Sequence, residues 1–157
     1  MKYKLTNRTK IINGHTLYQI RALINIPGVA YSGELGGWVE CKKNLSEKGN
    51  AWVYGNARVY RNAWVSGDVR VYGDAQIFEN ARVYDNARIF GNARVYDNAC
   101  VYGDARVSGN AQVSGNAWVS GNAQVSGDAW VSGDAWVSGY ARVFGDAQVS
   151  GNARVSG

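Results

Sequence analysis

The sequence predicts an all-β fold, a parallel β-helix of triangular cross-section, and three observations lead to it. From Gly49 the chain divides into eighteen consecutive hexads without an insertion. Val or Ile occupies the fifth place of every hexad, and Ala occupies the third place of all but one, where Val69 stands instead. Six residues per side and three sides per turn make about six regular coils, the arithmetic of a hexapeptide-repeat solenoid.

Each hexad is expected to form one short strand and one corner. The third and fifth places alternate with a variable residue, so Ala and Val should face inward and the residue between them outward. The first place is Gly or polar, and the second is Asn or Asp except at Tyr140. These residue types tolerate the left-handed backbone that a sharp turn requires.

Residues 1–48 do not follow the six-residue period, and they predict a small N-terminal capping module before the repeat domain of residues 49–157. Asn13 and Gly14 are typical of the turn of a β-hairpin. Such a cap would cover the apolar end of the solenoid and block edge-to-edge pairing. We expect burial of Ile20, Ala22, Ile24 and Ile26 in the hairpin region, and we expect Trp38, Val39 and Leu45 to lie in a first irregular coil.

The segments LGGWVE at residues 35–40 and NLS at 44–46, followed by GNAWVYGNARVY from Gly49, carry a resemblance. Over essentially its whole length the chain resembles hexapeptide-repeat proteins of bacteriophages and prophages, whose function is not established and which are often labelled acyltransferases. The resemblance implies a phage context and, as in other hexapeptide-repeat folds, a left-handed coil. It implies no particular activity.

The net charge of +5 arises entirely from residues 1–48, because the repeats carry nine Arg against nine acidic residues. We expect any broad basic surface on the N-terminal module. Cys41 and Cys100 follow no metal spacing and are expected to be free thiols in a reducing compartment. With no signal peptide or apolar span, the expected location is the cytoplasm of the bacterial host, without membrane contact.

Residues eighteen apart should stack on one face, so the outward surface can be deduced from the sequence. One column runs from Trp52 through Arg70, Arg88 and Arg106, with Asp68 and Asp104 placed to relieve the repulsion between guanidinium groups. The sixth place is mostly aromatic in the first three coils and mostly Ser afterwards. Such surfaces are typical of protein interfaces. The candidate binding residues are Arg70, Arg88, Arg106, Tyr72, Phe90, Tyr96, Tyr102, Trp118 and Trp136.

These residues favour a non-enzymatic rod that binds a host or viral macromolecule, for instance as an inhibitor of a host defence or nucleic-acid enzyme. Two alternatives stay open: an acyltransferase using His15 at a subunit interface, and direct nucleic-acid binding through the basic N-terminal module and the Arg column. The coils offer no catalytic residue, and we expect no metal or cofactor. No cap follows the last hexad, so we expect a homo-oligomer through this rung, or else a longer repeat protein.

Overall fold

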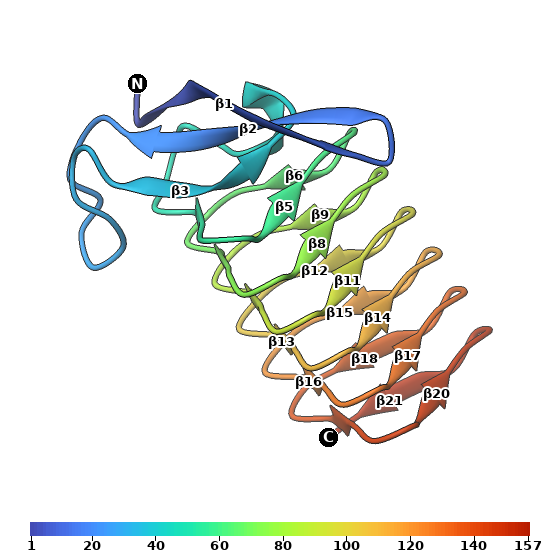
Figure 1. Cartoon of the computed structure of the whole chain (residues 1–157). Helices are drawn as coiled ribbons and strands as arrows, with labels where there is room; N and C mark the ends of the chain where they lie inside the picture. Colours follow the sequence, from blue (N-terminus) through green and yellow to red (C-terminus); the bar gives the residue numbers. More distant parts are fainter.

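The computed structural model describes residues 1–157 and is an all-β parallel solenoid of about seven turns (Figure 1). The first 48 residues, called the head below, form β1 (Tyr3–Ile12), β2 (His15–Ala22), β3 (Leu35–Val39) and the short 3-10 helix η1 (Lys42–Asn44). No helix of the chain is long and apolar enough to cross a membrane.

Every hexad forms a strand of two or three residues over its fourth and fifth places, as its alternation predicts. The strands are β4 (Trp52–Val53), β5 (Arg58–Val59), β6 (Trp64–Val65), β7 (Arg70–Val71), β8 (Gln76–Ile77), β9 (Arg82–Val83), β10 (Arg88–Ile89), β11 (Arg94–Val95), β12 (Cys100–Val101), β13 (Arg106–Val107), β14 (Gln112–Val113), β15 (Trp118–Val119), β16 (Gln124–Val125), β17 (Trp130–Val131), β18 (Trp136–Ser138), β19 (Arg142–Val143), β20 (Gln148–Val149) and β21 (Arg154–Ser156).

The strands form three parallel ladders, one on each side of the solenoid (Figure 1). Two sheets have six strands, in the orders β4-β7-β10-β13-β16-β19 and β6-β9-β12-β15-β18-β21. The third continues into the head as the nine-stranded sheet β1-β2-β3-β5-β8-β11-β14-β17-β20. The eighteen hexads form six regular turns, and β3 with the bridge from Leu45 to Val65 adds an irregular turn, which brings the total to about seven.

The core is a narrow column of Ala and Val, as the third and fifth places predict. From Ala51 to Val137 every such residue is at most 1% exposed. The backbone of each turn bonds to the next, as where Arg88 N donates to Ala105 O at 3.0 Å. The inward side chains pack against those of the neighbouring turns, and the backbone groups form hydrogen bonds between turns. The outward residues are therefore attached to a rigid backbone.

The corners turn through a left-handed backbone at the first place of the hexads. Gly occupies most of these positions, but Arg61, Glu79, Asp85 and Asp97 adopt φ values of 56 to 60°. At this position the carboxylates of Asp85 and Asp97 accept hydrogen bonds from the backbone amides of Gly103 and Gly115, one turn further along the solenoid. Asn side chains at the second place add amide ladders, such as Asn62 to Asn80 to Asn98.

The head covers the first turn of the solenoid. Asn13 and Gly14 form the hairpin turn with φ of 49° and 81°, as predicted. Ile24 was expected inside but is 52% exposed, because β2 ends at Ala22 and the alternation stops there. Trp52 was expected outward but is 1% exposed. The Tyr3 ring packs edge-on against its indole, so the first position of the Arg column belongs to the core.

Lys2 is buried between the head and the first turn of the solenoid, although it is an ionisable residue. It is 4% exposed, and its Nζ donates to the Ala51 carbonyl at 3.0 Å, while its backbone N donates to Glu47. Burial lowers the pKa of Lys2 to about 8, against the opposing charges of Glu47 and Asp68. Burial also raises the pKa of Tyr3, whose hydroxyl donates to the carbonyls of Lys42 and Leu45.

These two shifts predict a stability maximum in alkaline solution. Between pH 8 and 10 the folded state has released the Lys2 proton that the unfolded chain still holds, so unfolding free energy rises with pH, by about 1–2 kcal/mol after solvent screening. Above pH 10 the unfolded chain loses the Tyr3 proton first, so stability falls. Urea unfolding across this range would measure both slopes. Lys2→Met should lose the rise, and an equal rise in that variant would contradict the assignment.

Candidate functional site

The structure brings the predicted Arg column together on one six-stranded sheet. Arg88 lies opposite Arg70 on one side and Arg106 on the other, in β7, β10 and β13. Arg88 and Arg106 are exposed, and Arg70 is half-buried. None of the three forms an ion pair, so Asp68 and Asp104 do not relieve the repulsion by direct contact. Asp68 instead accepts from the backbone N of Asn50, because its corner directs it to the previous turn.

An aromatic ladder borders this column at the adjoining corner. The Tyr72 and Phe90 rings are stacked, with centroids 4.9 Å apart and planes at 1°. Tyr54 meets Tyr72 edge-on at 6.5 Å. All three rings are half-buried. Stacking one turn apart fixes their side chains, so this border presents a preorganised apolar surface beside the guanidinium groups.

The head loop converts this border into an open groove of about 490 Å³. Tyr54 donates its hydroxyl to the Val29 carbonyl at 3.3 Å, which holds the loop against the first turns. Burial raises the pKa of Tyr54, while the positive charge of Arg70 opposes the shift. The groove, called the Arg–aromatic groove below, is lined by Gly28, Val29, Tyr54, Arg70, Tyr72 and Arg88.

The other predicted binding residues lie elsewhere on the solenoid. Tyr96 stacks on Phe78 at 5.0 Å along a second corner, and its hydroxyl donates to Gln112. Tyr102 meets Trp118 edge-on, and Trp118 stacks on Trp136 at 4.9 Å on the third sheet. Arg154 caps this pair at 5.2 Å from the Trp136 ring. The aromatic residues at the sixth places therefore form three separate ladders, and the ladder of Tyr72 and Phe90 borders the Arg column.

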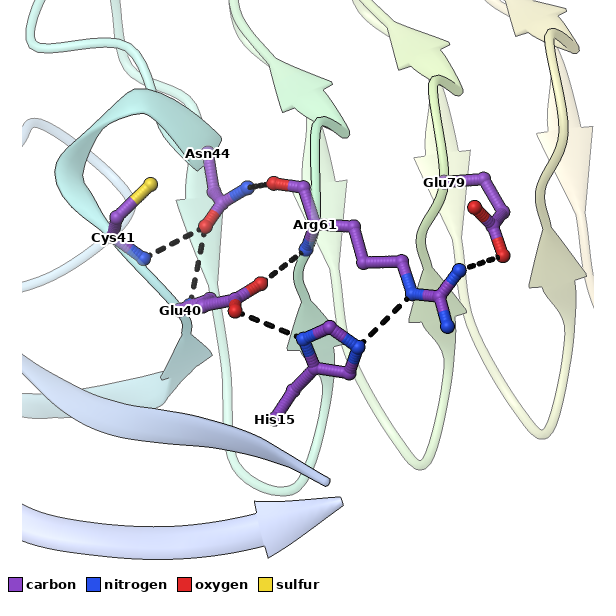
Figure 2. Close-up of polar contacts among 6 residues, drawn as sticks. All are labelled: His15, Glu40, Cys41, Asn44, Arg61 and Glu79. Atoms are coloured by element: carbon purple, nitrogen blue, oxygen red, sulfur yellow. Dashed lines mark hydrogen bonds and ion pairs between the residues drawn. The ribbon is translucent and has the colours of Figure 1, made fainter. Parts of the chain in front are cut away.

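A polar cluster joins the head to the first corners, and Figure 2 shows it. His15 Nδ1 lies 2.9 Å from Glu40 Oε1, and Arg61 Nε donates to His15 Nε2 at 3.1 Å. The other Glu40 oxygen accepts from Arg61 N, and the Arg61 guanidinium pairs with Glu79. Burial opposes ionisation of Glu40, but these hydrogen bonds from His15 and Arg61 outweigh it and lower the pKa of Glu40.

The direction of these bonds fixes the chemistry of His15. Because Arg61 Nε can only donate, His15 Nε2 is the acceptor and Nδ1 carries the proton given to Glu40. Both ring nitrogens are engaged, so neither is free to take a proton from a substrate in this arrangement. Sequence reasoning singled out His15 without Glu40, Arg61 or Glu79. A signal was present, because Arg61 and Glu79 replace corner Gly in hexads one turn apart.

Comparison with known proteins agrees with the repeat architecture. A family model described as YdcK Beta solenoid repeat matches residues 51–67, 87–103, 111–125, 123–139 and 147–157. Apart from Gly157, all of these segments lie in the hexads that form the three ladders. No curated protein matches the chain. The protein is a β-solenoid repeat protein.

Proposed function

We propose that the protein is a non-enzymatic rod of phage or prophage origin that binds a protein partner at the Arg–aromatic groove. The observation that carries the proposal is the pair Arg70 and Arg88, which have no acidic partner and border the rings of Tyr54 and Tyr72, which meet edge-on. A partner with a carboxylate beside an apolar side chain would satisfy both features. Inhibition of a host defence or nucleic-acid enzyme is one use of such binding.

The composition of the groove supports a protein partner. Tyr and Arg are the residue types that most often dominate binding energy when they are rigid and become fully desolvated. Here the rings are fixed by stacking and by the bond from Tyr54 to Val29, so little side-chain entropy is lost on binding. Arg can hold a carboxylate through two parallel hydrogen bonds, which would orient the partner.

The phage context and the finer description of the coil belong to the same proposal. They rest on the LGGWVE head, the NLS segment and the unbroken hexads, which resemble phage and prophage hexapeptide-repeat proteins. Within this proposal the coil is left-handed and of the hexapeptide type. An experimental structure with a right-handed coil would remove this part of the proposal and leave the groove unaffected.

The acyltransferase alternative is less well supported. It needs a general base within reach of the proton it removes. His15 lies between Glu40 and Arg61, and both of its ring nitrogens are used in binding them. His15 also packs 5.8 Å from the Tyr60 ring. The cluster is better explained as a clasp that fixes the head on the first turns.

The proposal predicts that charge reversal in the groove abolishes capture of one partner. Tagged wild type and the variant Arg70→Glu/Arg88→Glu would be compared in host lysate by quantitative mass spectrometry, and the retained protein would then be purified and titrated. We expect saturable binding that the variant weakens at least 100-fold, because two carboxylates then repel the partner.

Arg142→Glu is the matched control, since Arg142 is exposed on the same sheet near its far end. It should bind as wild type does. A partner that the double variant retains as strongly as wild type, or no partner at all, would contradict the proposal.

A further inference from the structure

The nine-stranded sheet carries a second charged surface, distinct from the Arg–aromatic groove. Residues directly opposite each other on paired strands share a face, as do residues two apart along one strand. Lys4 lies opposite Arg21, and Gln19 lies opposite Trp38. Trp38 in turn lies opposite Arg58, and Gln76 separates Arg58 from Arg94. The outer face therefore runs without a break from the head onto the first turns, as Figure 1 shows for the strands themselves.

Two more cations reach this face from β1. Lys10 Nζ lies 4.0 Å from the centroid of the Trp38 ring, and Arg8 donates to Gln19 at 3.5 Å. None of the nine strands contains an acidic residue. None of the cations forms an ion pair. The set, called the basic face below, consists of Lys4, Arg8, Lys10, Arg21, Arg58 and Arg94.

The basic face is short of negative charge in its interior as well as at its edge. Arg58 Nε is buried without a hydrogen-bond partner. Burial and then the charge of Arg58 lower the pKa of Lys10, and only Asp74 opposes them. Lys4 and Arg21 are like charges placed directly opposite each other, a pairing that destabilises an isolated sheet. An anion bound over these groups would offset the repulsion between Lys4 and Arg21 and the unbalanced positive charge at Lys10 and Arg58.

The edge of the face is also hollowed. Pairing of β1 with β2 is irregular between Leu5 and Thr9, and an open groove of about 380 Å³ lies at this point. Lys4, Arg8 and Arg21 line it together with Leu5, Thr6 and Asn7. Three cations around a concave surface can contact one phosphate group from several sides.

Protection of a free strand edge does not account for the whole basic face. Charged residues on an edge strand do prevent pairing with another chain, which explains Lys4 and Arg8 on β1. Arg58 and Arg94 lie inside the sheet, where no edge needs protection. Their positions therefore call for a second explanation.

We propose that the basic face binds the phosphate backbone of a nucleic acid. The cations extend across six strands, from β1 to β11, which is about 24 Å at the usual strand spacing. A polyanion with regularly spaced charges matches such a strip. An acidic protein matches it less well, because Trp38 lies under Lys10 and offers no open aromatic anchor, unlike the rings of the Arg–aromatic groove.

The test is binding of fluorescently labelled 20-nucleotide single-stranded DNA, single-stranded RNA and duplex DNA to the full chain, followed by anisotropy at several salt concentrations. Contact by five or six cations predicts a slope of log affinity against log salt of about −4 for single strands, and steeper for duplex. Binding in any of the three arms with this dependence supports the proposal, and the preferred arm identifies the form of nucleic acid.

Lys4→Glu/Arg21→Glu should weaken binding at least tenfold and make the slope shallower, and Lys4→Gln/Arg21→Gln should have a smaller effect in the same direction. Both residues are exposed, and circular dichroism would verify folding. Arg154→Glu, exposed on another sheet, is the matched control and should not change affinity. Arg88→Glu should also leave it unchanged, which separates this face from the groove.

Three results would overturn the proposal. One is the absence of binding to all three oligonucleotides in 50 mM salt. Another is equal weakening by Arg154→Glu and by the Lys4 and Arg21 pair. The third is displacement of the oligonucleotide by polyglutamate at equal charge concentration, which would identify an acidic protein as the occupant.

Discussion

Replacing Asn44 by Asp is expected to destabilise the protein by about 3–5 kcal/mol, although the side chain keeps its size. Asn44 is fully buried and makes four hydrogen bonds. Its Oδ1 accepts from the backbone N of Glu40 and of Cys41, and its Nδ2 donates to the Arg61 carbonyl (Figure 2). Its Nδ2 also donates to the carbonyl of Ala63. Asp would place an oxygen against those two carbonyls, leaving a buried charge and two acceptors without donors.

A second substitution at Asn44 distinguishes the loss of its hydrogen bonds from the burial of a charge. Asn44→Ala removes all four bonds and leaves a cavity, and we expect a loss of about 2–4 kcal/mol. Urea unfolding followed by tryptophan fluorescence would measure both variants. Asn56→Asp is the control, because Asn56 occupies an exposed corner where other hexads already carry Asp, and its effect should stay within about 0.5 kcal/mol. Similar losses for Asn44→Asp and Asn56→Asp would show that the four hydrogen bonds of Asn44 do not hold the head in place.

The regular turns could be predicted from the sequence because every hexad forms the same strand and corner with the same two inward positions. Ala and Val recur at a spacing that only a repeated inward face explains, and the residues between them must then form columns. The register of Arg70, Arg88 and Arg106 followed from counting eighteen residues. The head does not follow the six-residue period, so its packing could not be deduced in this way. Ile24 continued an alternation beyond the end of its strand, and Trp52 was placed outward because nothing in its hexad indicates that Tyr3 covers it.

The candidate sites depend on contacts between the head and the turns, so they were only partly predictable. Columns identified Arg70, Arg88 and Tyr72, but the loop at Gly28 and Val29 that completes the groove comes from an aperiodic segment. The charge count placed the net positive charge in residues 1–48. It did not reveal that the nine-stranded sheet continues this charge onto Arg58 and Arg94, because strand pairing between the head and β5 has no sequence period.

The paired glycines of the LGGWVE segment have a steric explanation, and it leads to the second large effect. Gly37 is buried in β3 with an ordinary extended backbone, so conformational freedom is not the reason for glycine. A Cβ at this position would lie 2.6 Å from Val53 Cγ1 and 2.7 Å from the Ala57 carbonyl oxygen. Trp38 N donates to that same carbonyl, so it cannot move without breaking the first bond between the head and β5.

Gly37→Ala is therefore expected to cost about 2–3 kcal/mol, the upper part of the usual range for overpacking a well-filled core, and to loosen the head before the turns below it. Hydrogen exchange should show faster exchange at Trp38 and Glu40, whose amides bond to Ala57 and Val59, while Arg106 and Ser108 keep their protection. Gly55→Asn is the matched control, because φ is 53° there and no atom lies within 4 Å of the added Cβ. Asn tolerates that backbone, so stability should change by about 0.5 kcal/mol or less. Equal losses in the two variants, or unchanged exchange at Trp38 and Glu40, would contradict the steric explanation, which rests on the close approach of β3 to the first turn.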